Sequence, residues 1–387
     1  MAFVPRELAG VIKLVVREFP SLVLTGPRRS GKTTLLRRLF RRAGHILLED
    51  PDMIARARAD PRGLLESLRL PVILDEIQNV PELFGYVRTM IDRQPRRMGL
   101  WLFTGSQEAP LMKGVTESMA GRAAVLQLLP FSRRETTKVD ILTGGFPEAL
   151  AKPKTRDIWY ASYLQTYLER DVRGVAGIRD LATFRRFLSL VAARHGQVLN
   201  RSDIAAPLGV SVPTISAWLE ILEITGQVLI VPPYFENFGK RLLKSPKVYW
   251  LDSGLACHLL GIRSPAELDR SPFLGVLFEG FIASEIAKDQ VNSGLRKQIY
   301  FFRDRQGLEV DFVVLRPGRG LWLIECKASR TVHPSEAAAL LTVGKAARNT
   351  EKRMLVVHRK SRVPSPFRAL APGVEALDVD QFLEELG

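Results

Sequence analysis

The sequence predicts an α/β protein built from three regions, on three observations. Within the first 150 residues, five short apolar runs alternate with segments of helix length, at 21–24, 45–48, 72–74, 100–103 and 125–128. That alternation is typical of buried parallel strands joined by helices. Residues 155–265 instead carry long amphipathic stretches, and residues 308–328 resemble two strands joined by a turn. We therefore expect a parallel-sheet domain at 1–150, a helical domain at 151–268 and a second α/β domain at 269–387.

Composition narrows the class of protein. The chain has 387 residues, of which 46% are hydrophobic and 25% charged, an ordinary balance for a globular protein. Its two cysteines, Cys257 and Cys326, lie far apart without CxxC spacing, so the sequence supports neither a disulfide framework nor a zinc site. No uncharged stretch reaches the roughly 18 residues of a membrane helix. We expect a soluble cytoplasmic protein without a signal peptide or a membrane partner.

The net charge of +15 would attract a polyanion, as in many nucleic-acid-binding proteins. All three regions contribute to the excess, so charge alone marks no single binding domain. A generic basic surface that serves solubility would give the same total.

A glycine-rich loop follows the first apolar run. The stretch GPRRSGKT at 26–33 fits GxxxxGK[ST], the pattern of a loop whose backbone N–H groups bind phosphate. Gly26 and Gly31 allow a close backbone approach, Lys32 would reach the β- and γ-phosphates, and the Thr33 hydroxyl would ligate Mg²⁺. We expect the rest of the loop to line the same ATP site, namely Pro27, Arg28, Arg29, Ser30 and Thr34.

Two acids after the third apolar run complete the predicted site. In PVILDEIQNV, Asp75 would hold Mg²⁺ through water and Glu76 would act as general base for the attacking water. The alternative is that these acids only begin a helix, with Asp75 as its cap. The next run ends in LWLFTGSQ, where Ser106 is a candidate γ-phosphate sensor, although an ordinary strand-to-loop transition would look the same. Arg122 could reach a neighbouring subunit's nucleotide as an arginine finger, or be a lone surface arginine.

The motifs TGPRRSGKTTLL, VILDEIQNVPEL, LFTGSQ, MAGR, LLPFS and GGFPEAL together resemble bacterial and archaeal AAA-type ATPases with a C-terminal restriction-endonuclease-like domain. In that family the ATPase module is followed by a winged helix and then by the nuclease-like module. The resemblance covers essentially the whole chain. It implies a Mg²⁺-dependent ATPase that uses Lys32, Thr33, Asp75 and Glu76.

The helical region contains a predicted helix-turn-helix followed by a wing. Amphipathic stretches at 158–173 and 181–194 precede it. Ser202 would cap a helix that ends near Leu208, Gly209 would form the turn, and Ser211 would cap a second helix. That second helix would bury Ile215, Leu219 and Leu222.

We expect this region to contact DNA through side chains of the second helix and of the basic segment GKRLLKSPK, namely Thr214, Ser216, Lys240, Arg241, Lys244 and Lys247. The second helix carries no lysine or arginine, however. A winged helix that only joins domains or subunits is the alternative.

The last region carries a nuclease-like pattern. Glu325 and Lys327 would project from one side of a strand and Cys326 from the other, with Asp311 on the partner strand. Two carboxylates and a lysine can hold Mg²⁺ and orient water for phosphodiester attack. The set resembles the PD-(D/E)xK motif, with Glu279 as the upstream acid, although Val310 replaces the proline. A charged hairpin would give the same pattern by chance, and the fold also serves for binding alone.

Taken together, these regions favour a homo-oligomeric ATPase, for which a hexameric ring is one fitting form. It would translocate on or remodel DNA, including branched DNA in recombination or repair, while the last region binds or cuts DNA. The alternatives are a nucleotide-dependent switch that acts on a partner protein and an ATP-regulated Mg²⁺ nuclease.

Overall fold

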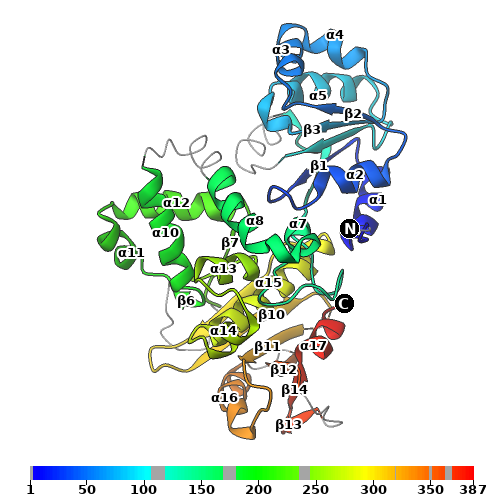
Figure 1. Cartoon of the computed structure of the whole chain (residues 1–387). Coiled ribbons are helices and arrows are strands. Elements are labelled where there is room, and N and C mark those ends of the chain that lie inside the picture. The colour runs from blue at the N-terminus through cyan, green and yellow to red at the C-terminus, as the bar shows by residue number, and fades with distance from the viewer. Residues whose placement is uncertain are drawn as a thin grey trace.

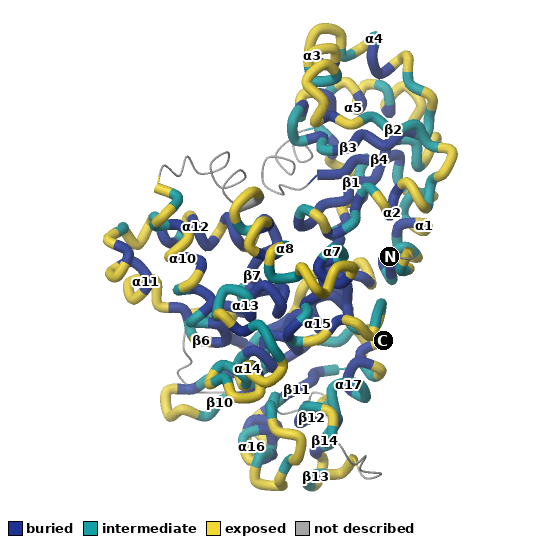
Figure 2. Tube along the Cα trace, viewed as in Figure 1, coloured by how far each residue is buried: buried dark blue, intermediate teal, exposed yellow. Residues whose placement is uncertain are grey.

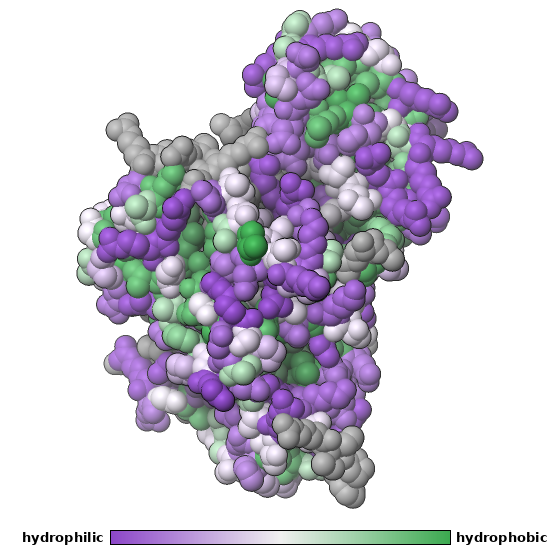
Figure 3. Space-filling model, in the orientation of Figure 1, coloured by the Kyte–Doolittle hydropathy of each residue, from purple (hydrophilic) through white to green (hydrophobic). Residues whose placement is uncertain are grey.

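The computed structural model describes residues 3–105, 118–168, 180–234, 245–318, 320–347, 351–361 and 368–387. Figure 1 shows a sheet domain at the top, a helical part at the left and a second sheet at the bottom. Hydrophilic side chains cover most of the face seen in Figure 3.

The first sheet contains five strands that pair in parallel in the order β2-β3-β4-β1-β5. Each predicted apolar run is confirmed as a strand, with ends that shift by no more than two residues. The strands are β1 (Ser21–Thr25), β2 (Gly44–Leu47), β3 (Val72–Asp75), β4 (Trp101–Thr104) and β5 (Ala123–Gln127). Every residue of β1, β3 and β4 is buried, because helices cover both faces of the sheet.

Two groups of helices cover this sheet. Helices α1 (Leu8–Glu18) and α2 (Lys32–Leu39) pack on one face, and α3 (Pro51–Ala59), α4 (Pro61–Glu66) and α5 (Leu83–Arg93) pack on the other. Local signals begin α3 and α4, since Asp50 and Asp60 each accept a hydrogen bond from the first turn and a proline follows each of them. The short 3₁₀ helix η1 (Ile77–Asn79) follows β3.

The helical region begins with α7 (Pro147–Ala151), the 3₁₀ turn η2 (Pro153–Thr155) and α8 (Arg156–Tyr163), which continues as a π-helix, η3 (Leu164–Leu168). The predicted helix over 158–173 therefore changes its winding after Tyr163, and residues 169–179 lie outside the described part. Then come α10 (Leu181–Ala193), β6 (Gln197–Val198), α11 (Arg201–Leu208), α12 (Val212–Ile224), β7 (Val228–Val231) and β8 (Lys247–Trp250). The three strands form an antiparallel sheet in the order β6-β8-β7.

Helices α11 and α12 form the predicted helix pair, with an angle of 109° between them. The Ser211 cap is confirmed, because its Oγ accepts a hydrogen bond from the Thr214 amide at 3.2 Å. The Ser202 cap is wrong: Asn200 caps α11 and accepts a bond from the Ser202 amide at 3.1 Å, so the helix begins one residue before Ser202. The predicted buried positions of α12 are confirmed, at Ile215, Leu219 and Leu222.

The last region is a six-stranded mixed sheet in the order β13-β14-β12-β11-β10-β9. Helices α13 (Ser253–Leu259) and α14 (Pro265–Arg270) lead into the long α15 (Leu274–Asn292). The strands are β9 (Ile299–Arg303), β10 (Glu309–Arg316), β11 (Gly320–Lys327), β12 (Lys352–His358), β13 (Ala369–Ala371) and β14 (Val374–Asp378). The predicted hairpin is confirmed as β10 and β11, which pair antiparallel with Phe312 opposite Ile324.

Helices α15 and α17 (Val379–Leu386) cover one face of this sheet, while η4 (Pro334–Ala337) and α16 (Ala338–Ala346) cover the other. The apolar core under α15 also takes in residues from the other two regions, among them Leu129 and Phe131 from the first and Leu229 and Tyr249 from the second. Figure 2 shows buried positions along α15 and both large sheets. One hydrophobic core therefore spans all three regions.

Within the described residues, no single helix has the length and apolarity needed to cross a bilayer, and one bent pair, α11 with α12, meets those criteria when the two helices are taken together.

Candidate nucleotide-binding site

The glycine-rich loop connects β1 to α2 and has a backbone that few side chains tolerate. Gly26 has φ +134° and Gly31 has φ +98°. A Cβ atom on Gly26 would overlap the carbonyl oxygen of Leu128, the residue after β5, whereas a Cβ atom on Gly31 would have nothing within 4 Å. Glycine at 26 therefore lets the loop pack directly against the end of the neighbouring strand.

Lys32 begins α2, and its side chain is buried. The Nζ atom donates hydrogen bonds to the carbonyl oxygens of Gly26 and Pro27, at 2.9 Å each. Gly31 caps the helix without a side-chain acceptor, and the amides of a helix's first turn are the donors that bind anions. The loop thus presents a positive charge and backbone donors at the position predicted for phosphate.

The two predicted magnesium ligands of this site lie together although they are 42 positions apart in the chain. The Thr33 hydroxyl lies 2.9 Å from each oxygen of Asp75. Asp75 also contacts His45 Nε2 at 3.3 Å and accepts a bond from the Thr104 hydroxyl. A hydroxyl and a carboxylate suit Mg²⁺, so these residues fit the ion as the sequence predicts. Asp75 ends β3 and is not a helix cap, because the next residue, Glu76, has a left-handed backbone conformation instead of a right-handed helical one.

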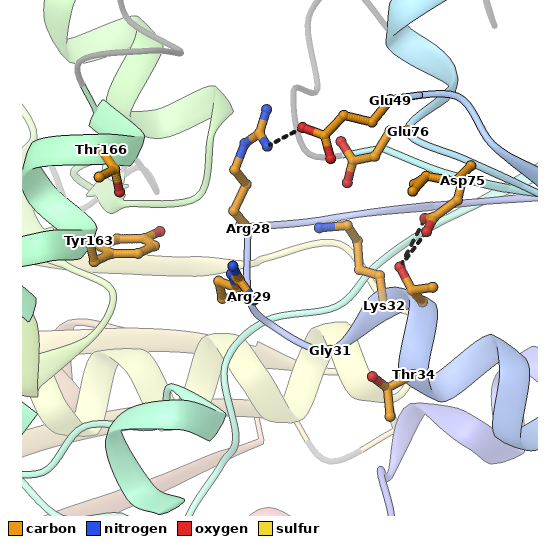
Figure 4. Close-up of a pocket in the computed structure, with 12 residues that line it drawn as sticks. Arg28, Arg29, Gly31, Lys32, Thr34, Glu49, Asp75, Glu76, Tyr163 and Thr166 are labelled. Atoms are coloured by element: carbon orange, nitrogen blue, oxygen red, sulfur yellow. Dashed lines mark hydrogen bonds and ion pairs between the residues drawn. The ribbon is translucent and has the colours of Figure 1, made fainter. Parts of the chain in front are cut away.

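Glu76 has a left-handed backbone, φ +58°, which is uncommon for a residue with a side chain. Its amide donates to the Thr104 hydroxyl at 3.2 Å, and its carboxylate accepts a bond from Gln78 Nε2 at 2.5 Å. Strained backbone of this kind gathers at functional sites. Figure 4 shows Glu76, Asp75 and Lys32 around one cavity.

The cavity has a volume of about 530 Å³, within the range of small-molecule and cofactor sites. The ATPase side contributes most of its wall, including the Arg28 and Glu49 side chains, which lie 3.8 Å apart. Tyr163 and Thr166 of the helical region form the facing wall (Figure 4). Sequence reasoning missed both residues, because the amphipathic pattern predicts a helix here but not which side faces the loop.

The glycine-rich loop also contacts the end of α12. The Pro27 ring lies so close to Gly226 that a Cβ atom there would be 3.0 Å from Pro27 Cγ. The next residue, Gln227, donates from Nε2 to the Tyr163 hydroxyl at 3.0 Å. Direct contacts therefore join the wall of the cavity to the segment between α12 and β7.

Comparison with known proteins agrees with this geometry. Residues 18–137 match the model of an AAA domain, and two domains of unknown function match at 134–266 (DUF8612) and 274–371 (DUF4143). The chain is 33% identical over 321 residues to the uncharacterized proteins Rv2008c of Mycobacterium tuberculosis and Mb2031c of Mycobacterium bovis, covering 81% of this chain and 72% of each relative. The chain belongs to the family of these mycobacterial proteins.

Two solved structures show a more distant likeness to the chain. The Walker-type ATPase PABY2304 of Pyrococcus abyssi has 17% identity and a TM-score of 0.46, covering 66% of this chain and 95% of that one. RuvB of Thermotoga maritima has 15% identity and a TM-score of 0.32, covering 58% and 89%.

Arg122 of the AAA domain is paired within its own chain. Its Nε and Nη2 donate to the two carboxylate oxygens of Asp92 at 2.6 and 3.0 Å, and this bond lowers the pKa of Asp92. A role at a neighbouring subunit would require Arg122 to leave Asp92. The predicted sensor Ser106 lies outside the described residues.

The nuclease-like residues lie on neighbouring strands, as predicted. Lys327 Nζ donates to Glu325 Oε1 at 2.8 Å, and Asp311 Oδ2 accepts a bond from the Cys326 amide at 2.8 Å. Burial, followed by the charge of Glu279, raises the pKa of Asp311 to about 7. Burial, followed by the charge of Asp311, raises the pKa of Glu325 to about 7.

The predicted DNA contact at Lys247 is wrong. Only 3% of its side chain is exposed, and Nζ lies 2.9 Å from Glu279, 2.6 Å from Glu309 and 3.9 Å from Asp311. The count of basic residues in the segment could not show this, because the acids come from α15 and β10. Lys240, Arg241 and Lys244 lie outside the described residues.

The predicted metal set of Glu279, Asp311 and Glu325 does not form a metal-binding group. Across the described ranges, no three or more His, Cys, Asp or Glu side chains are placed to hold a metal ion together. The Lys247 ammonium lies among the acids instead. On α12, Thr214 and Ser216 are half-buried and make local bonds, to Ser211 Oγ at 2.8 Å and to the Val212 carbonyl at 3.2 Å.

Proposed function

We propose that this chain is a Mg²⁺-dependent AAA-type ATPase whose hydrolysis of ATP drives translocation on DNA or its remodelling. The contact of Thr33 with Asp75, beside Lys32 and Glu76 in one cavity, carries the ATPase part of the proposal. Lys32, whose Nζ donates to two loop carbonyls, would bind phosphate oxygens, and Thr33 and Asp75 would hold the Mg²⁺ ion. Bound Mg²⁺ supplies positive charge against the phosphates. Glu76 accepts a proton from the water that attacks the γ-phosphorus, and ADP and phosphate leave.

The contacts between the loop and α12 support a mechanical output. Movement of Pro27 when phosphate binds would press on Gly226, and movement of Tyr163 would reach Gln227. Both residues lie at the junction of α12 and β7. The order α10, β6, α11, α12, β7, β8 supports our proposal of a winged helix, in which the second helix of the pair would contact DNA.

DNA is the partner that the charge favours. The net charge of +15 would provide the electrostatic attraction, and we propose that the half-buried Thr214 and Ser216 of α12 contact the DNA. We propose branched DNA of recombination or repair as the substrate, with the C-terminal region as a DNA-binding module. In a homo-oligomeric ring, such as a hexamer, Arg122 would act on the neighbouring nucleotide.

The decisive experiment measures ATP turnover without nucleic acid and with single-stranded, duplex and four-way-junction DNA. We expect turnover to rise at least several-fold with the preferred DNA. Turnover that is the same under all four conditions would contradict the proposed action on DNA but not the proposed ATPase activity. Absence of any Mg²⁺-dependent turnover would contradict both parts of the proposal.

Two variants assign that turnover to the site. Lys32→Ala should abolish productive ATP binding, and Glu76→Gln should bind ATP but not hydrolyse it, as measured by titration calorimetry and phosphate release. Lys13→Ala, an exposed lysine on α1, is the matched control and should behave as the parent. Unchanged ATP affinity in Lys32→Ala would contradict its assigned role.

A second candidate is a nucleotide-dependent switch that acts on a partner protein. It is favoured by one observation, that Tyr163 and Thr166 of the helical region line the cavity, so that occupancy alone can reposition that region. A switch should turn over slowly, retain its nucleotide and ignore DNA. An ATP-regulated Mg²⁺ nuclease is not proposed, since the Lys247 ammonium contacts Glu279 at 2.9 Å and lies 3.9 Å from Asp311, two of the three acids predicted to hold its metal.

A further inference from the structure

A buried lysine joins the helical region to the C-terminal region. Lys247 is the first residue of β8, and its ammonium contacts Glu279 of α15 and Glu309 of β10 at 2.9 and 2.6 Å. Asp311 of β10 lies at 3.9 Å. The nearby Tyr249 hydroxyl donates a hydrogen bond to the same Glu279 oxygen at 2.5 Å. Lys247 is thus surrounded by acids from elements that follow it in the chain.

The distances from Lys247 Nζ to Glu279 and Glu309 are those of charge-assisted hydrogen bonds. Such hydrogen bonds, from N⁺–H to a carboxylate, are about 2.7–2.9 Å long. Asp311 Oδ2 accepts a hydrogen bond from the Cys326 amide, and Glu325 Oε1 accepts one from Lys327 Nζ. Glu325 Oε2 is buried without a hydrogen-bond partner, so of the acids near Lys247 this one keeps an uncommitted oxygen.

We infer that Glu279, Glu309 and Asp311 form a built-in site for the Lys247 ammonium, so that the nuclease-like region holds a strand of its neighbour instead of a catalytic metal. The lysine neutralises carboxylates that would otherwise be buried with like charges beside them. The acids of the nuclease-like motif then serve as an internal ion-pair site for Lys247, and the region does not cleave phosphodiesters. This inference is independent of the proposed ATPase activity.

The ion pairs of Lys247 also fix the position of β8, the strand that carries this residue. Lys247 pairs through its backbone with Val198 of β6 and Val231 of β7, so its side-chain bonds attach the whole small sheet to α15 and β10. A bridge between Pro233 and Phe301 lies along the same boundary. Movement between the two regions would therefore have to break the lysine's ion pairs.

The test is Mn²⁺ binding, measured by the paramagnetic resonance signal of free Mn²⁺. The full chain carries Thr33→Ala and Asp75→Asn as a background, so that the glycine-rich loop contributes no ion. We expect no Mn²⁺ binding below millimolar concentration in that background. Adding Lys247→Met should create one Mn²⁺ site, and adding Asp311→Asn should abolish it. Lys327→Met is the matched control, because it removes a lysine beside the acids without vacating the ammonium position, and it should create no site.

Two results would overturn the inference. One is a Mn²⁺ site in the lysine-containing chain that Asp311→Asn removes. The other is a folded Lys247→Met chain that gains no Mn²⁺. Where Lys247→Met alone does not fold, Lys247→Gln, which removes the charge but keeps a hydrogen-bond donor for the acids, takes its place with the same expected gain.

A cleavage assay gives an independent readout in the unaltered chain. Supercoiled plasmid incubated with Mg²⁺ or Mn²⁺ should stay intact with the parent and with Glu325→Gln alike. If the parent nicks the plasmid and both Asp311→Asn and Glu325→Gln abolish the nicking, the inferred ion-pair site is refuted and the C-terminal region is a nuclease.

Discussion

Replacement of Gly26 by alanine should destabilise the chain more than replacement of Gly31. Both glycines lie in the same loop and both have positive φ, +134° and +98°. They differ in the space around them, because a Cβ atom on Gly26 would overlap the Leu128 carbonyl whereas one on Gly31 would meet nothing within 4 Å. The pair therefore separates steric overlap from backbone strain.

The magnitudes follow from those two contributions. A side chain in such a backbone region costs about 1–3 kcal/mol, and this applies to both variants. Overpacking against rigid backbone adds about 1–3 kcal/mol, and only Gly26→Ala carries it. At about 2–4 °C per kcal/mol for a protein of a few hundred residues, Gly26→Ala should unfold about 2–12 °C below Gly31→Ala.

Thermal unfolding without nucleotide measures the difference, with both variants heated at one scan rate in one buffer. Nucleotide is omitted because a methyl group on Gly31 could also meet a phosphate. Equal Tm values, or a lower Tm for Gly31→Ala, would refute the assignment of Gly26 to a close contact with the end of β5. Calorimetry with ATP should then show that Gly26→Ala, where folded, binds more weakly than the parent.

Three further predictions concern the rest of the chain. Lys247→Met should lower the free energy of unfolding by about 3–5 kcal/mol, because it leaves buried carboxylates without their cation. Adding Glu279→Gln should recover part of that loss. Equal Tm values for the parent and Lys247→Met would contradict the prediction. The pKa of Glu325 is raised from 4.5 to about 7, so the stability it contributes is present below about pH 4.5 and is lost as the pH rises through 7. Glu325→Gln should therefore gain in Tm on the parent between pH 5 and pH 8, and a difference that does not change with pH would count against the shift. Gln227→Leu removes the hydrogen bond to the buried Tyr163 hydroxyl, which should cost about 0.5–1.5 kcal/mol and reduce DNA stimulation of turnover. Full stimulation in this variant would argue against coupling through that bond.

The sequence was a good guide where the controlling interactions are local or fixed by strand direction. The apolar runs predict the strands because burial on both faces requires uninterrupted apolar residues. Thr33 and Asp75 were expected together because parallel strands present their carboxyl ends on one edge, and they lie 2.9 Å apart. The hairpin of β10 and β11 followed from alternation and turn residues.

The failures concern contacts between distant segments. Lys247 belongs to a run of basic residues that suggests an exposed loop, and nothing in that run reveals acids 32 and 62 positions later. Tyr163 and Thr166 lie in an amphipathic stretch whose pattern does not say which side meets the glycine-rich loop. The Ser202 cap failed for a local reason, since Asn200 caps equally well and is reached first.

The hydrophobic core that takes in Leu129, Leu229 and Phe281 has a practical meaning for anyone who divides this chain. Cuts near 137 or 266, where the family models meet or end, would leave each fragment with an apolar surface that its missing neighbours normally cover. We expect such fragments to aggregate, and their failure to act would say nothing about the chemistry of the intact chain.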